Sequence, residues 1–273
     1  DSSTSRGLGD VYKRQVVMNN SPIDIDKLIE GTNEILTANR NSLQLFDMLH
    51  SMRQFDDLTY VHSVNVALIA SILGQWLKFS EKDIRILTIS GLLHDIGKIM
   101  IPNEILTKPG KLTVAEYNIM KQHVNFGYEK VKNQNIDIRI KEACLLHHEK
   151  CDGTGYPFGL KSDHIPAVAK IIAIADVYDA MTSARVYRGA LCPFEVIDTM
   201  YKDAFTKFEP EYILPFLKNV ASSYINNDVR LSDGRIGKVV LINENALSLP
   251  IVQCEDEFID LSKTRGLTVS AIL

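Results

Sequence analysis

The chain has few of the features that define several large classes of protein. Its 273 residues include only four cysteines and one tryptophan. The cysteines are Cys144, Cys151, Cys192 and Cys254. They form no C-x-x-C pair, which argues against a zinc knuckle and against a disulfide framework. The longest nearly apolar stretch, residues 64–73, is interrupted by Asn65 and Ser71 and is shorter than the ~20 residues that span a bilayer. We therefore expect a soluble, cytoplasmic protein without a membrane segment.

The charge of the chain is nearly balanced. There are 30 Lys and Arg residues against 34 Asp and Glu residues, which gives a formal net charge of -4. No basic face stands out, and this argues against a nucleic-acid polymer as a partner. At 45% hydrophobic residues, the chain is long enough to bury one large core with a small appendage.

The first fifteen residues are interpreted separately. Residues 5–15 resemble the in-frame translation of a transposon-based sequencing adapter, and they lack the apolar core of a secretory signal. We therefore treat residues 1–15 as an artefact and leave them out of the fold prediction.

Apolar residues recur at helical spacing from residue 23 to residue 224. Residues 16–48 are predicted to form leading helices. In the part that follows, Ser80 with Asp83 and Thr113 with Glu116 indicate helix starts. The predicted helices there are 57–78, 80–93, 113–123, 137–149, 166–181, 193–205 and 211–224. The fold class is therefore mainly α.

The pattern changes after Asn227, where short alternating segments predict β-strands. The dipeptide Asp233-Gly234 indicates a hairpin turn between the first two strands. The predicted strands are 229–231, 236–242, 249–254 and 258–261. Residues 228–273 are therefore predicted to form a small β appendage, and because it contains no histidine we expect a packing or docking role for it.

Histidines and aspartates recur on the predicted helices in a way that suggests a metal site. The residues concerned are His62, His94, Asp95, His123, His147, His148 and Asp176. A single histidine on an apolar helix is usually an ordinary buried or surface residue, because a buried polar group needs only a hydrogen-bond partner. Several such imidazoles in one core would each need a partner, and divalent metal ions would satisfy them together.

Three motifs accompany these residues. They are GLLHDIGK at residues 91–98, HHE at 147–149 and DGTGYP at 152–157. From about Leu49 to Tyr224 the chain resembles the HD-GYP family, a branch of the HD-domain metal-dependent phosphohydrolases. The resemblance implies a helical HD-domain bundle and predicts a catalytic domain at residues 49–224.

The resemblance also implies two divalent metal ions, with iron or manganese favoured. One ion would be held by His62, His94, Asp95 and Asp176. The other would be held by Asp95, His123 and His147, so that Asp95 bridges the two. His148 ranks behind His147 as a ligand, because adjacent helical residues point about 100° apart. Members with a third metal have a glutamate where this chain has Leu58, so we expect only two ions.

The resemblance assigns further roles in catalysis and substrate binding. Asp95 and Lys98 are expected to be catalytic, with the Lys98 ammonium meeting a phosphate oxygen. Asp179 is expected to bind substrate, or to orient a cation or a ligand imidazole. The other predicted substrate-binding residues are Gly153, Gly155, Tyr156, Pro157, Arg185 and Arg188. Without the resemblance, these lysine and arginine residues would be ordinary surface cations and the glycine-rich segment an ordinary turn.

The expected activity is hydrolysis of cyclic di-GMP to linear pGpG and, in some members, on to GMP. Two alternatives remain open: another HD-type nucleotide phosphohydrolase, and a signalling module that binds a cyclic dinucleotide without cleaving it. A homodimer and a protein partner at the DGTGYP loop also remain open. His50 and His164 match no motif position and are predicted to be ordinary surface or packing residues.

Overall fold

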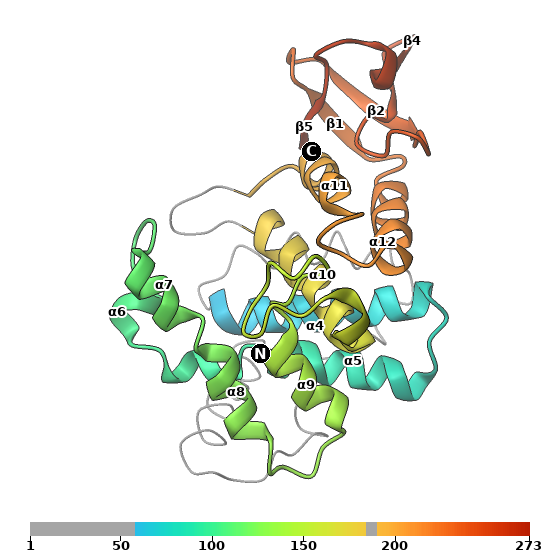
Figure 1. Cartoon of the computed structure of the whole chain (residues 1–273). Coiled ribbons are helices and arrows are strands. Elements are labelled where there is room, and N and C mark those ends of the chain that lie inside the picture. Colours follow the sequence, from blue (N-terminus) through green and yellow to red (C-terminus); the bar gives the residue numbers. More distant parts are fainter. Residues whose placement is uncertain (1–57, 184–189) are drawn as a thin grey trace, which may run out of the picture.

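The computed structural model describes residues 58–183 and 190–273 of the chain (Figure 1). Residues 1–57 and 184–189 lie outside this description. The adapter-like segment 1–15, the predicted leading helices at 16–48, His50, Arg185 and Arg188 therefore remain sequence-based predictions.

The described part begins with a helical body and ends with a small sheet (Figure 1). Its α-helices are α4 Leu58–Trp76, α5 Glu81–Leu93, α6 Asn103–Leu106, α7 Val114–Met120, α8 His123–Val131, α9 Ile138–Leu146, α10 Ala167–Thr182, α11 Pro193–Asp203 and α12 Pro210–Ser223. Short 3-10 helices are η1 Ile96–Met100, η2 Ser162–His164 and η3 Leu261–Lys263.

Helix α4 lies at the centre of the helical body. Residues 63–74 of this helix are all buried, so the nearly apolar stretch of the sequence packs on every side rather than on one face. Helices α5, α10 and α12 pack against it. None of the helices within the described ranges is long and apolar enough to cross a membrane.

The predicted helix 113–123 differs from the observed one. Thr113 and Glu116 form a reciprocal capping box at the start of α7, as the sequence indicates, but α7 ends at Met120. A separate helix, α8, then begins at His123, and the helical spacing did not predict it. At the break, the His123 imidazole donates a hydrogen bond from Nδ1 to the Met120 carbonyl oxygen at 2.7 Å, which a continuing helix would bond to a later backbone N–H.

The C-terminal residues form a five-stranded antiparallel sheet in the order β4-β3-β2-β1-β5. The strands are β1 Asp228–Leu231, β2 Ile236–Leu241, β3 Ile251–Cys254, β4 Glu257–Asp260 and β5 Val269–Ile272. The four predicted strands are confirmed, and Gly234 has the positive φ of 93° that the predicted hairpin turn requires. The prediction missed β5, which pairs with β1 at the sheet edge. The fold is therefore a mainly helical body followed by a small antiparallel sheet.

Candidate metal centre

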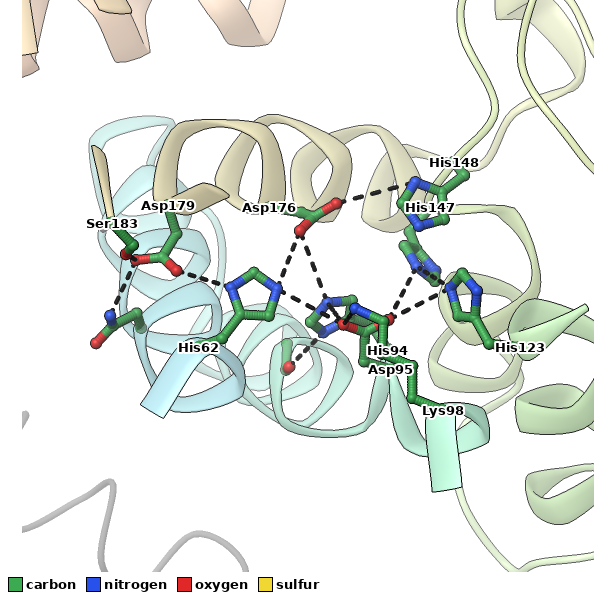
Figure 2. Close-up of polar contacts among 12 residues, drawn as sticks. His62, His94, Asp95, Lys98, His123, His147, His148, Asp176, Asp179 and Ser183 are labelled. Atoms are coloured by element: carbon green, nitrogen blue, oxygen red, sulfur yellow. Dashed lines mark hydrogen bonds and ion pairs between the residues drawn. The ribbon is translucent and has the colours of Figure 1, made fainter. Parts of the chain in front are cut away.

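The predicted metal ligands come from five different helical elements and converge on one buried point (Figure 2). His62 lies on α4 and Asp176 on α10, while the other residues lie at helix ends. These other residues are His94 and Asp95 after α5, His123 at the start of α8, and His147 and His148 after α9. The convergence itself is a tertiary property, since the first and last of these residues are more than a hundred positions apart.

Two glycines of the 91–98 motif allow the elements to approach this closely. A Cβ atom on Gly91 would lie 2.4 Å from the Cα atom of Ala67 on α4. A Cβ atom on Gly97 would lie 1.9 Å from the carbonyl oxygen of His123. Because Gly91 has no side chain, the end of α5 can pack against α4. Because Gly97 has none, η1 can pack against α8. Both glycines belong to the 91–98 motif, but the motif alone indicated no role for them.

The Asp95 carboxylate lies between two sets of imidazoles. Its Oδ2 atom is 3.6 Å from His62 Nε2 and 3.3 Å from His94 Nε2. Its Oδ1 atom is 3.3 Å from His123 Nε2 and 3.8 Å from His147 Nε2. Each oxygen therefore faces a different set, as the predicted bridging role requires.

The ligand atoms fall into two groups that share Asp95, each with its atoms within 4.8 Å of one another. The groups are His62, His94 and Asp95, and Asp95, His123, His147 and His148. Asp176 lies between them: its Oδ1 atom is 3.1 Å from His62 Nε2 and its Oδ2 atom is 3.9 Å from His148 Nδ1 (Figure 2). His148 thus belongs to the second group by position.

Three of the imidazoles are held by the backbone so that one nitrogen faces the centre. His94, His123 and His147 donate hydrogen bonds from Nδ1 to backbone carbonyl oxygens of the preceding turn, at 2.7, 2.7 and 3.0 Å. A carbonyl oxygen only accepts, so the proton of a neutral ring lies on Nδ1 and the Nε2 lone pair is free. This is the orientation that metal-binding histidines adopt.

Burial keeps the second group of imidazoles neutral. Desolvation lowers the pKa of His123, lowers that of His147 well below its ordinary value, and lowers that of His148 to about 3. The Nε2 atoms of His123 and His147 are only 3.5 Å apart. Two lone pairs facing each other at this distance repel, and a cation between them would remove the repulsion.

Nearby carboxylates keep His62, in the first group, protonated at neutral pH. Burial alone would lower the pKa of His62, but hydrogen bonds and charges from Asp176 and Asp179 outweigh it and raise the pKa to about 9. For the Asp95 carboxyl, burial alone would raise the pKa, but the positive charge of Lys98 and the contact with His94 hold the pKa well below its usual range. In the metal-free protein at neutral pH, an ion that binds His62 therefore displaces a proton from it.

The donor set fits a pair of divalent ions. The buried atoms His94 Nε2 and Asp95 Oδ1 have no hydrogen-bond partner among the described residues, although other imidazole and acidic groups lie close by. Unpartnered buried polar atoms are costly, and here they both face the same point. Imidazole and carboxylate donors without thiolate suit iron, manganese, zinc or nickel.

Asp179 contacts the metal centre through His62. Its Oδ2 atom lies 2.7 Å from His62 Nδ1, its Oδ1 atom accepts from Asn65 Nδ2 at 2.9 Å, and it also accepts from the Ser183 hydroxyl. In this position Asp179 orients the His62 imidazole, whose metal-binding role is a prediction; substrate binding and orientation of a cation by Asp179 also stay predictions. Asn65 was not predicted as part of the site, because its only signal in the sequence was a polar residue within an apolar run.

The DGTGYP loop lies beside His148. Gly153 has a φ of 82°, and a Cβ atom on Gly155 would lie 2.5 Å from the Cα atom of Glu149, so both glycines are needed for this backbone path. The Tyr156 ring stacks on the His148 imidazole at a centroid distance of 4.7 Å. The loop that includes Tyr156 and Pro157 therefore adjoins the second group of ligands.

Glu149, which the sequence analysis quoted in a motif without a role, fixes this loop. Its carboxylate is buried and accepts hydrogen bonds from the backbone N–H groups of Phe158 at 2.7 Å and Leu160 at 2.8 Å. Because Glu149 follows His148 directly, the same short segment positions the imidazole and the loop that packs on it.

Replacing Glu149 with glutamine is expected to loosen the loop. The amide group presents N–H to one of the two backbone N–H donors, so one charge-assisted hydrogen bond is lost and the free energy of unfolding falls by about 2 kcal/mol. Amide hydrogen exchange should become faster at Phe158 and Leu160. The control is Glu129→Gln at an exposed carboxylate, and equal exchange in both variants would contradict the assigned role.

The remaining predicted residues lie as follows. The Lys98 ammonium is 2.5 Å from Asp95 Oδ2 and its side chain is 25% exposed, so it adjoins the centre while remaining open to solvent. His164 is exposed and pairs with its neighbour Asp163, so it is a surface residue, as predicted. Leu58 is the first residue of α4, one turn before His62.

The comparison with protein families agrees with this geometry. A family model described as HD domain matches residues 29–212, which is more than half of the chain. A cyclic di-GMP phosphodiesterase of Pseudomonas aeruginosa is 36% identical over 203 residues, covering 74% of this chain and 49% of that protein. The cyclic di-GMP phosphodiesterase response regulator RpfG of Xanthomonas campestris is 36% identical over 197 residues, covering 71% and 52%.

A relative named for a different cyclic dinucleotide also matches. The 3'3'-cGAMP-specific phosphodiesterase 2 of Vibrio cholerae is 32% identical over 194 residues, covering 70% of this chain and 37% of that protein. The chain thus spans about half the length of its cyclic di-GMP relatives and less of this one.

A solved structure shares the fold. It is described as an HDG"Y"P protein from Bdellovibrio bacteriovorus, and it superposes with a TM-score of 0.61 at 19% identity, covering 78% of this chain and 69% of that one. The family match, the relatives and the His94-Asp95 centre agree, and the chain belongs to the HD-domain family, in its HD-GYP branch.

Proposed function

We propose that this chain is a metal-dependent phosphodiesterase that hydrolyses a cyclic dinucleotide, with cyclic di-GMP as the first candidate. The observation that supports this most is the Asp95 carboxylate, whose two oxygens each face a separate set of buried imidazoles. The relatives named for cyclic di-GMP and for 3'3'-cGAMP support the substrate class.

The proposed ligands are those predicted from the sequence. His62, His94, Asp95 and Asp176 would hold one ion, and Asp95, His123 and His147 the other, with His148 close enough to join the second set. When bound, such a pair of divalent ions supplies a strong Lewis acid and an activated water for attack on a phosphodiester. Iron or manganese remains the favoured identity by resemblance.

The protein itself would position and neutralise the substrate. The Lys98 ammonium lies next to Asp95, where it would contact a bound phosphate oxygen and stabilise the charge that grows during hydrolysis. Asp179 keeps the His62 ring turned so that Nε2 faces the centre. Gly153, Gly155 and Pro157 would shape the loop that presents Tyr156 to the substrate, and Arg185 and Arg188 are proposed to bind phosphate.

Removal of the metal is expected to abolish activity. After dialysis against a chelator, hydrolysis of cyclic di-GMP should fall by a factor on the order of a hundred or more, since no side chain at the centre replaces a Lewis acid. Adding back manganese or anaerobic ferrous iron should restore it. The measurement is chromatographic separation of the linear dinucleotide and the mononucleotide, with metal content determined on the same samples.

The same assay separates the alternatives. Cleavage of 3'3'-cGAMP in preference to cyclic di-GMP would change the substrate within the proposed class. Cleavage of a mononucleotide alone would indicate another HD-type phosphohydrolase. Tight binding of a cyclic dinucleotide by metal-loaded protein without any product would indicate a signalling module, and would contradict the proposed activity.

A further inference from the structure

We propose that Tyr117 and Lys121 form a second substrate contact at the rim of the metal centre, where Lys121 binds the phosphodiester that is not being hydrolysed and Tyr117 binds the purine base next to it. This inference rests on the proposed function and specifies how a substrate with two phosphates is recognised.

The position of these residues follows from the break between α7 and α8. Tyr117 lies on α7, and Lys121 lies one helical turn later and two residues before the proposed ligand His123. His123 is fixed by its hydrogen bond to the Met120 carbonyl oxygen. The short backbone segment that holds this imidazole in the centre therefore also places Lys121 at its edge.

A row of rings leads from the centre to these residues. The Tyr156 ring stacks on His148 at 4.7 Å, and the Tyr117 ring meets Tyr156 edge-on at 6.5 Å between centroids. Tyr156 is also 6.4 Å from the His123 ring. Tyr117 is 48% exposed, so much of its ring is open to a ligand. Nucleobases stack on such exposed aromatic rings, because each base has an apolar face.

The charge of Lys121 lies over the same rings. Its ammonium is 5.3 Å from the centroid of Tyr117 and 6.0 Å from that of Tyr156. No carboxylate of the described residues lies within ion-pair distance of it, whereas Lys98 is bound to Asp95 and Lys108 to Glu116. No carboxylate of the described residues therefore competes with an anionic ligand for the Lys121 ammonium.

The chemistry of a cyclic dinucleotide matches this arrangement. Its ring contains two phosphodiesters, and when one lies at Asp95 the other must lie outside the metal centre. Lys121 and His148 both lie near the Tyr156 ring: the Lys121 ammonium is 6.0 Å from the ring centroid, and the His148 ring centroid is 4.7 Å from it. A purine base and a phosphate bound here require an aromatic face beside a cation, which Tyr117 and Lys121 supply. A diester with one phosphate and no base would not bind at this contact.

The test compares KM and kcat for Lys121→Gln with those of the unaltered protein, both loaded with manganese. We expect the KM for the cyclic dinucleotide to rise about tenfold with a smaller change in kcat, since a charge-assisted contact is lost away from the scissile bond. The preference for the cyclic dinucleotide over bis(p-nitrophenyl) phosphate should fall by a similar factor. Lys121→Arg should recover most of the affinity, and Tyr117→Ala should weaken binding more than Tyr117→Phe.

The matched control is Lys82→Gln, which removes an exposed lysine from the opposite end of α5, far from His94. An unchanged KM in Lys121→Gln with an active parent protein would overturn this inference alone. A parent protein that neither binds nor cleaves a cyclic dinucleotide would overturn the proposed function and this inference with it. An equal rise in KM in Lys121→Gln and Lys82→Gln would show that the two lysines act only by general electrostatic attraction. That result would also overturn the inference.

Discussion

Asp95→Asn is expected to lower kcat/KM for a cyclic dinucleotide by at least about a thousandfold, which corresponds to about 4 kcal/mol of transition-state stabilisation. The substitution keeps the size of the side chain and removes its charge. Both carboxylate oxygens face imidazoles, at 3.3 Å from His94 and 3.3 Å from His123, so an amide nitrogen at either position would turn a donor toward a proposed metal. The two proposed sites share this residue, and both are expected to fail together.

Metal content gives a readout that does not depend on activity. We expect about two ions per chain in the parent protein and less than one in Asp95→Asn, measured by elemental analysis after the same loading procedure. Circular dichroism should show unchanged helix content. The matched control is Asp163→Asn, because Asp163 also lies beside a histidine, His164, but both side chains are exposed to solvent. Two bound ions per chain in Asp95→Asn would contradict the proposed bridging role of Asp95.

Gly97→Ala is expected to have the largest effect on stability among single-methyl changes near the site. The added Cβ atom would lie 1.9 Å from the His123 carbonyl oxygen and 2.4 Å from the Gly127 backbone nitrogen. Both contacts are with backbone, which cannot rotate away, so η1 and α8 must separate. Overpacking of this kind costs about 3 kcal/mol or more of the free energy of unfolding. The separation would also move Asp95 and His123 apart, so metal affinity should fall as well.

Gly127→Ala is the matched control, because it adds the same methyl group on the other side of the same crossing. Its Cβ atom would lie 3.4 Å from the Gly97 nitrogen and 3.6 Å from Ile96, which are ordinary contacts. Alanine also favours the helix α8 over glycine, so this variant should be neutral or more stable by up to about 1 kcal/mol. Urea unfolding of both variants measures the difference. Equal stability of the two would show that the Gly97 contact does not limit the packing.

The sequence was sufficient to predict the type of fold and the chemical nature of the site. Helical spacing up to residue 224 and alternating spacing beyond residue 228 depend on local geometry, and they anticipated the helical body and four of the five strands. Strand β5 was missed because its four residues acquire a partner only by pairing with β1, about 40 positions earlier. The end of α7 was missed because a side chain, His123, takes the Met120 carbonyl oxygen.

The residue types His94, Asp95 and His147 already identified imidazole and carboxylate chemistry, because ligand identity is a property of the side chain alone. Only the tertiary structure decided which carboxylate oxygen faces which imidazole, that Glu149 anchors the loop, and that Gly91 and Gly97 allow the close crossings. Such relations depend on contacts between residues far apart in the chain, and no local periodicity encodes them. The sequence thus determined which groups are available, and the packing of the helices determined where they meet.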